Sequence, residues 1–273
     1  MLSCSNENLA KKICDIIGSK LQLPSESKQP FKCLGPLTEF NGSELRQFRS
    51  GVTQSCTKHI QRLLKAHGWN KAASDEDDSK PGEPLPTNCL QQIYAATGPA
   101  EGTSAHAKLQ KQKGFSCRTL LGEILCACVT CRPDCGYAVV TLSKFASAPA
   151  AIHCGRLRAL AKYLRRTAHW GITFWRPAPL MTLPEGTPAP TPDDKDLPEF
   201  PSPWSPQELA GHVDAAHAND LRNRRSTTGY IFTMAGGAIA CRSTTQGITA
   251  TSSTEAELHA AGRAHARATS EMS

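Results

Sequence analysis

Apolar residues recur at helical spacing in two places within residues 1–69. The first group comprises Leu9, Ile13, Ile16 and Ile17. The second group comprises Cys56, Ile60, Leu63, Leu64 and His67. Spacings of three and four residues place side chains on one face of an α-helix. The pattern therefore predicts two ordinary amphipathic helices without chemistry, separated by an irregular or extended stretch.

Residues 115–175 keep this period for longer, which predicts a mostly helical segment. After the candidate N-cap Ser116, the first apolar face comprises Leu120, Leu121, Ile124, Leu125 and Cys128. Two later faces comprise Val139, Leu142 and Phe145, and then Leu157, Leu160, Ala161 and Leu164. The phrase Arg132-Pro133-Asp134 separates the first two helices, because proline disfavours helical backbone at the preceding residue.

The period changes from residue 209 onward. Residues 212–217 alternate as a strand does, and two short β-prone runs follow at 227–233 and 238–243. Ser252 and Glu255 then form a capping-box signature ahead of an alanine-rich helix that extends to about Thr269. The predicted fold class is α/β, of the α+β kind, with a helical region followed by three strands and a helix.

Two stretches divide the chain. Residues 70–114 contain an acidic run and several prolines and are assigned to a partly disordered linker, and residues 176–208 hold ten of the nineteen prolines. Proline-rich sequence stays extended and packs poorly. The expected units are therefore 1–69, 115–175 and 209–273, joined by these two linkers.

The charge favours a polyanionic partner, since the net charge is +7 and the pI is about 8.8. No apolar run approaches the ~18 residues that a membrane span needs. The first residues lack the apolar segment of a secretory signal, so we expect an intracellular protein without a membrane partner, whose twelve cysteines are reduced.

Two carboxylates are candidates for metal chemistry. Asp214 lies in a predicted strand, and Glu257 lies in the first turn of the last helix, on a face with Ala260, Ala261 and Ala264. A carboxylate on a face that packs against a sheet is costly unless it is paired or metal-bound. Oxygen ligands suit Mg²⁺, and a pair of such ions can assist phosphodiester cleavage. The alternative is a surface aspartate and a helix-start glutamate stabilised by the helix dipole.

Two basic groups and a cysteine run are further candidates. The cations Arg158, Lys162, Arg165 and Arg166 share one helix face, and Arg222, Arg224 and Arg225 cluster between two strands. Each group suits a phosphate backbone, and each is also typical of a solvated surface. The cysteines are Cys126, Cys128, Cys131 and Cys135. They include one C-x-x-C pair, as zinc sites do, but small buried apolar residues give the same pattern.

Several phrases, taken together, resemble copia-type (Pseudoviridae) LTR retrotransposon Pol polyproteins. They are Arg132-Pro133-Asp134 with Tyr137-Ala138-Val139, Lys162-Tyr163-Leu164-Arg165, Arg225-Ser226-Thr227-Thr228-Gly229-Tyr230 and Ser252-Ser253-Thr254-Glu255-Ala256-Glu257. Their order resembles a fragment that spans the end of the reverse transcriptase and the start of the RNase H domain.

The resemblance implies functions for these segments. Residues 209–273 would begin an RNase H-like domain, a mixed sheet with flanking helices that cuts the RNA strand of RNA–DNA hybrids. Asp214 would be its first Mg²⁺ ligand and Glu257 the second, with Glu255 as the fallback. Residues 115–175 would correspond to a connecting region that helps to hold the template–primer duplex, which favours nucleic-acid contact by the basic groups.

This sequence also departs from the family. The polymerase aspartates are absent, and no acidic residue suited to be the third RNase H carboxylate follows Glu257. Six cysteines stand where related elements typically carry tyrosine, namely Cys14, Cys33, Cys117, Cys126, Cys128 and Cys154. We therefore expect a catalytically incomplete fragment that binds nucleic acid at most. The alternatives are an RNase H completed by a partner or dimer, and a zinc-binding interaction protein.

Overall fold

The computed structural model describes residues 38–48, 51–70, 82–175 and 208–272, together with the isolated positions Lys12 and Ile16, and omits the side chains of 270–272. The first predicted helix lies outside the described residues except for these two positions. The proline-rich linker lies outside them except for Glu208.

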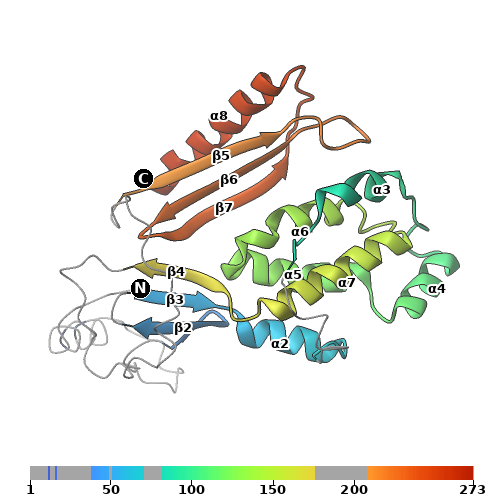
Figure 1. The fold of residues 1–273 in the computed structure, drawn as a ribbon, viewed down its shortest axis with the longest axis horizontal. Coiled ribbons are helices and arrows are strands. Elements are labelled where there is room, and N and C mark those ends of the chain that lie inside the picture. Colours follow the sequence, from blue (N-terminus) through green and yellow to red (C-terminus); the bar gives the residue numbers. More distant parts are fainter. Residues whose placement is uncertain are drawn as a thin grey trace.

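Six helices form a helical body (Figure 1). They are α2 (Thr57–Ala66), α3 (Leu90–Ala95), α4 (Ser104–Lys113), α5 (Cys117–Cys131), α6 (Gly136–Ser143) and α7 (Ala151–Arg166). Short 3-10 turns, η2 (Thr87–Cys89) and η3 (Pro133–Cys135), precede α3 and α6. The predicted apolar faces of α2, α5, α6 and α7 are buried in one continuous core, with the exceptions of His67, which is partly buried, and Leu125, which is 44% exposed. Helical periodicity therefore predicted this core correctly.

Residues 82–114 are structured, although the sequence analysis assigns them to a linker. Both α3 and α4 lie in this range, and Ile93 and Tyr94 are buried in the core of the helical body. The apolar residues of α3 span less than two helical turns between prolines, which is too short for a periodic signal. The linker assignment is thus wrong for this part of the chain.

A four-stranded antiparallel sheet lies at one end of the helical body. Its strands are β1 (Glu39–Phe40), β2 (Ser43–Phe48), β3 (Gly51–Ser55) and β4 (Gly171–Trp175). The pairing of β3 with β4 joins segments far apart in the sequence, and the hydroxyls of Thr53 and Thr173 lie 2.9 Å apart. The sequence pattern did not predict β4, because it follows directly on a long helix.

The second sheet comprises β5 (Ala210–Ala216), β6 (Thr227–Met234) and β7 (Gly237–Thr245), followed by α8 (Ser253–Met272). This is the predicted order of three strands and a helix, and the α+β class is confirmed. All pairings among these strands are antiparallel, whereas the resemblance implied a mixed sheet. Helix α8 lies along β5 on one face of the sheet (Figure 1).

The two sheets and the helical body meet around β7. The backbone N–H of Trp175 in β4 donates to the carbonyl of Ala235, in the turn between β6 and β7, at 2.7 Å. Strand β7 also contacts α6 and η3. The helical body therefore covers part of the face of the second sheet that α8 leaves open.

No single helix within the described ranges has the length and apolar composition to cross a membrane. Helices α4 and α5, which are bent by 56° relative to each other, reach the required length and apolar composition only when both are taken together.

Candidate functional site

Asp214 projects away from α8. It lies in the middle of β5, where its side chain is exposed, and it is in register with Gly229 of β6. Successive side chains of a strand point to opposite faces of the sheet. The next residue, Ala215, is buried in one cluster with Ala256 and Ala260 of α8. Asp214 therefore lies on the other face.

The two glutamates of α8 differ in their surroundings. Glu257 is exposed, because the buried stripe of this helix contains Ala256, Ala260 and Ala264, and not the expected Ala261. Glu255 is partly buried and accepts hydrogen bonds of 2.7 Å from both the backbone N–H and the hydroxyl of Thr251.

These two hydrogen bonds hold the pKa of Glu255 below its usual value, and His217, which follows β5, adds to this effect. Glu255 is also the less exposed of the two glutamates. The fallback residue is thus partly buried and held by hydrogen bonds.

The structure does not bring Asp214 together with either glutamate. Alternation along β5 places Asp214 on one face of the sheet, and α8 covers the other. No group of three or more potential ligands occurs among the described residues. Because the carboxylates do not converge, they do not fit a Mg²⁺ site in this arrangement. Mg²⁺ binding stays a prediction of the resemblance.

The four cysteines of the zinc alternative differ in their surroundings. Cys126 is exposed, whereas Cys128, Cys131 and Cys135 are buried. Burial raises the pKa of the Cys128 thiol to about 11 and also raises that of Cys135, which disfavours the thiolate that zinc requires. All four residues are described, and they form no metal-binding group. The cysteine run is therefore not a zinc site here, and three of its four members are core residues.

Four predicted nucleic-acid contacts form a basic ridge along α7, defined as Arg158, Lys162, Arg165 and Arg166. Positions four, seven and eight residues apart fall within about 100° around a helix axis. The opposite side of α7 buries Leu157, Leu160 and Leu164 in the core. Arg158 is exposed and the other three side chains are partly exposed. Core packing thus fixes the direction in which the ridge points.

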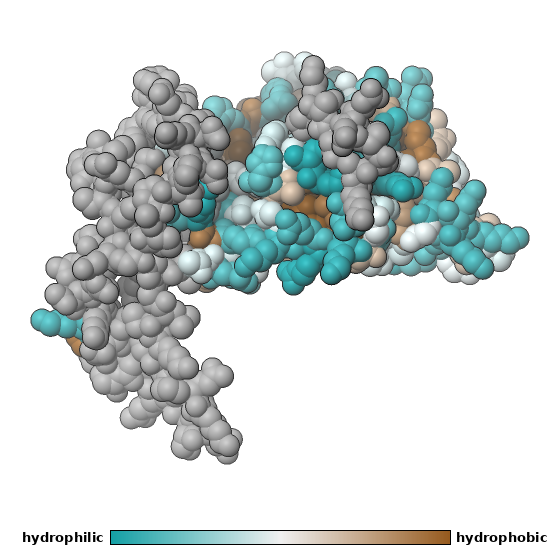
Figure 2. Space-filling model, turned by 60° about the horizontal axis from the view of Figure 1, so that its bottom comes forward, coloured by the Kyte–Doolittle hydropathy of each residue, from teal (hydrophilic) through white to brown (hydrophobic). Residues whose placement is uncertain are grey.

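Trp69, just beyond α2, contacts two residues of the basic ridge. The Arg158 guanidinium lies 5.3 Å from the centre of the Trp69 ring, and Arg165 donates to the Trp69 carbonyl at 3.5 Å. The indole in turn stacks on His67 and meets Phe115 edge-on. Viewed from the side of α2, mostly hydrophilic residues cover the described surface (Figure 2).

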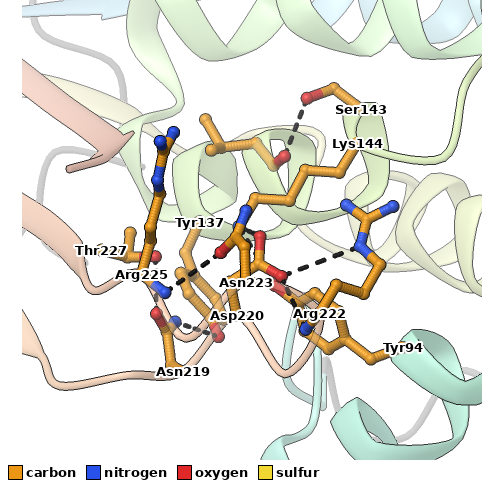
Figure 3. A network of polar contacts seen from close by, with 11 residues as sticks. Tyr94, Tyr137, Ser143, Lys144, Asn219, Asp220, Arg222, Asn223, Arg225 and Thr227 are labelled. Carbon is orange, nitrogen blue, oxygen red and sulfur yellow. Dashed lines mark hydrogen bonds and ion pairs between the residues drawn. The ribbon is translucent and has the colours of Figure 1, made fainter. Parts of the chain in front are cut away.

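The second basic cluster lies in the loop between β5 and β6, and this loop docks onto the helical body. Figure 3 shows Asp220 of this loop between Lys144 and Arg222. The Lys144 ammonium lies 3.0 Å from one Asp220 carboxylate oxygen, and the backbone N–H of Arg222 donates to the other at 3.2 Å. Lys144 also donates to the Tyr94 hydroxyl at 3.1 Å.

Asp220 is 1% exposed. Its burial raises its pKa, but the hydrogen bonds from Lys144 and from the Arg222 N–H outweigh this effect and hold the pKa below its usual value. The Arg222 guanidinium lies 4.6 Å from the centre of the Phe145 ring. Arg222 therefore joins the sheet to the helical body, while Arg224 and Arg225 are exposed.

Sequence reasoning missed the structural role of Arg132 and Asp134, which it treated as a helix break and as part of a family motif. Arg132 is 1% exposed and donates to both carboxylate oxygens of Asp134, at 3.0 and 2.7 Å. It also donates to the carbonyl and hydroxyl of Thr167, and the Tyr163 hydroxyl donates to Asp134 at 2.7 Å. Burial raises the pKa of Asp134, but the hydrogen bonds from Arg132 and Tyr163 keep it below its usual value. The motif links α5 to the end of α7.

The chain is 35% identical over 144 residues to secreted RxLR effector protein 161 of Plasmopara viticola, an alignment covering 53% of this chain and 82% of that protein. It is 33% identical over 232 residues to the retrovirus-related Pol polyprotein from transposon TNT 1-94 of Nicotiana tabacum. That alignment covers 84% of this chain but only 14% of the polyprotein. No family model and no solved structure matches the chain. The first alignment covers more than two thirds of the effector protein, so the chain belongs to the same family as that protein, and the second alignment supports a relationship to retrotransposon Pol polyproteins.

Proposed function

We propose that this chain is a retrotransposon-derived fragment that binds nucleic acid through the basic ridge of α7, with an RNA–DNA hybrid as the expected ligand, and that it lacks a complete catalytic site. The observation that supports binding is the placement of four cations on one outward face of a helix whose other face is locked in the core. A rigid helix keeps the spacing of these charges fixed.

The dimensions of the basic ridge suit a nucleic-acid backbone. Arg158 and Arg166 are eight positions apart, so the ridge extends about 12 Å along the helix axis at 1.5 Å per residue. One strand of a duplex presents a phosphate about every 3.4 Å along its axis. The ridge thus extends along roughly three to four phosphates of one strand. Arg158 on the Trp69 ring adds a planar group beside the charges.

The proposal of catalytic incompleteness rests on the side chain of Asp214 and on helix α8, which lie on opposite faces of the second sheet.

We also propose an intracellular location, where RNA–DNA hybrids occur, although one relative is named as a secreted protein.

Fluorescence anisotropy with a labelled RNA–DNA hybrid tests the binding proposal. The double variant Arg158→Ala/Lys162→Ala is expected to bind on the order of tenfold more weakly at low salt. The slope of log K against log salt is expected to fall by about 1.8, or 0.9 for each lost phosphate contact. The matched control is Lys108→Ala/Lys111→Ala, which removes two exposed cations of α4. Equal losses in both variants would show general charge attraction and contradict a site on α7.

A cleavage assay tests the second half of the proposal. The purified chain, incubated with the hybrid and Mg²⁺, is expected to leave the RNA strand intact. Cleavage that disappears in Asp214→Asn would refute catalytic incompleteness and support an RNase H completed by dimerisation. The binding result is independent of this outcome, because the basic ridge and Asp214 lie on different elements.

A further inference from the structure

Cys117 and Cys154 form a buried thiol pair in the helical body. Their Sγ atoms lie 2.8 Å apart, and the two residues are 2% and 1% exposed. Cys117 is the first residue of α5 and Cys154 lies in the first turn of α7, 37 positions further along the chain. A disulfide requires about 2.05 Å between sulfurs, so a small approach of two side chains brings them to bonding distance.

The surroundings of this pair make one sulfur the better nucleophile. Either sulfur can donate in the hydrogen bond between them; when Cys117 donates, the bond lowers the pKa of Cys154 against the effect of burial, and the Lys113 ammonium in the last turn of α4 lowers the pKa of both thiols. The same hydrogen bond and burial raise the pKa of Cys117. Thiolate is the reactive form of cysteine. Cys154 is therefore expected to react first, with Cys117 as the neighbouring thiol that follows.

We propose that Cys117 and Cys154 are an oxidative modification site, which hydrogen peroxide converts into an intramolecular disulfide. In the first step the Cys154 thiolate attacks one peroxide oxygen, the O–O bond breaks, and hydroxide leaves and takes up a proton to become water. Cys154 is then a sulfenic acid. In the second step the Cys117 sulfur attacks the Cys154 sulfur, the S–O bond breaks, and a second water leaves with the Cys117 proton. Two thiols are oxidised by two electrons, and one peroxide is reduced to two waters.

Both residues are almost completely buried, so the proposed reaction requires a local opening of the first turns of α5 and α7 that admits peroxide, a molecule close to water in size. The resulting disulfide joins the first turns of α5 and α7 and closes a covalent ring over the 37 positions that separate the two residues. Such cross-links stabilise a fold chiefly by restricting its unfolded chain. Oxidation is therefore expected to raise the Tm of the chain by several degrees, and dithiothreitol is expected to reverse the rise.

Peptide mapping of the full chain tests the proposal. The protein is treated with hydrogen peroxide, alkylated under denaturing conditions, digested without reduction and examined by mass spectrometry. The expected result is a linked peptide pair that contains Cys117 and Cys154 and disappears on reduction. The proposal is overturned if both residues remain alkylated thiols, or if Cys154 advances to sulfinic acid without forming the link.

Two variants and a control sharpen the test. Cys154→Ala and Cys117→Ala are each expected to abolish the link, because each removes one of the two sulfurs. Cys126→Ala removes an exposed thiol and is expected to keep the link and the rise in Tm. A link that depends on Cys126 would contradict the proposal. If a buried variant fails to fold, the map of the unaltered chain decides alone.

Discussion

Replacing Asp134 by asparagine removes the counter-charge of a guanidinium that is almost completely buried. Arg132 is 1% exposed, and two of its hydrogen bonds go to this carboxylate. Loss of one partner from a buried ion pair costs about 3–5 kcal/mol, because the other charge stays desolvated. The Asp134 side chain is 32% exposed, so we expect a loss of unfolding free energy at the low end of this range, about 3 kcal/mol. At roughly 2–4 °C for each kcal/mol, the Tm falls by about 6–12 °C.

Urea unfolding followed by circular dichroism measures this loss, and a surface pair provides the control. Arg118 makes two hydrogen bonds to Glu101, at 2.9 and 2.8 Å, but their side chains are 69% and 50% exposed. Glu101→Gln is therefore expected to cost under about 1 kcal/mol.

The single variant Arg132→Met and the double variant Arg132→Met/Asp134→Asn complete a double-mutant cycle. Because the double variant removes both charges, its cost is expected to fall short of the sum of the single costs by about 2 kcal/mol or more. A cost of Asp134→Asn below about 1 kcal/mol, or strict additivity in the double variant, would refute the reasoning from burial.

Three further predictions concern packing and pH. A Cβ on Gly98 would lie 2.2 Å from backbone atoms of a neighbouring loop, so Gly98→Ala is expected to lower the free energy of unfolding by about 1–3 kcal/mol. Gly122 on α5 faces open space, so Gly122→Ala is expected to raise the free energy of unfolding by up to about 1 kcal/mol; urea unfolding measures both. Burial lowers the pKa of His153, so the unfolded chain takes up a proton first as the pH falls below about 6.5. Stability should decline there, and an unchanged slope between pH 7.5 and 5.5 in His153→Gln would contradict this. Ala260→Leu should lower the Tm by overpacking α8 against the sheet, while Ala261→Leu at an exposed position should not. Equal changes in Tm would contradict the assignment of Ala260 to the face of α8 that packs on the sheet.

The tautomer of His153 shows how much a single side chain depends on tertiary contacts. Its Nδ1 accepts from the backbone N–H of Ala150 at 2.8 Å, so its Nε2 carries the proton and donates to the Ile93 carbonyl at 2.9 Å. The ring also stacks on Phe145. Its bond to α3 became visible only when residues 82–114 proved to be structured.

Periodicity in the sequence predicted part of the elements of this protein. Apolar residues spaced three and four positions apart predicted α2, α5, α6 and α7, and an alternating stretch followed by two β-prone runs predicted β5, β6 and β7. A local signal suffices for these elements, because each presents one continuous apolar face to a core. The charges of the basic ridge followed from the same argument, since the face opposite a buried stripe points to solvent.

Tertiary structure decided the pairing of distant segments and the faces of single residues. The contact of β3 with β4 and the burial of Arg132 between α5 and α7 depend on residues far apart in the chain. Asp214 is a candidate ligand by sequence, but a strand turns successive side chains to opposite faces, and α8 packs beside Ala215. The sequence alone thus identified the carboxylates and the cations. Which of them share a surface depends on how the helix docks on the sheet, and no local pattern encodes that choice.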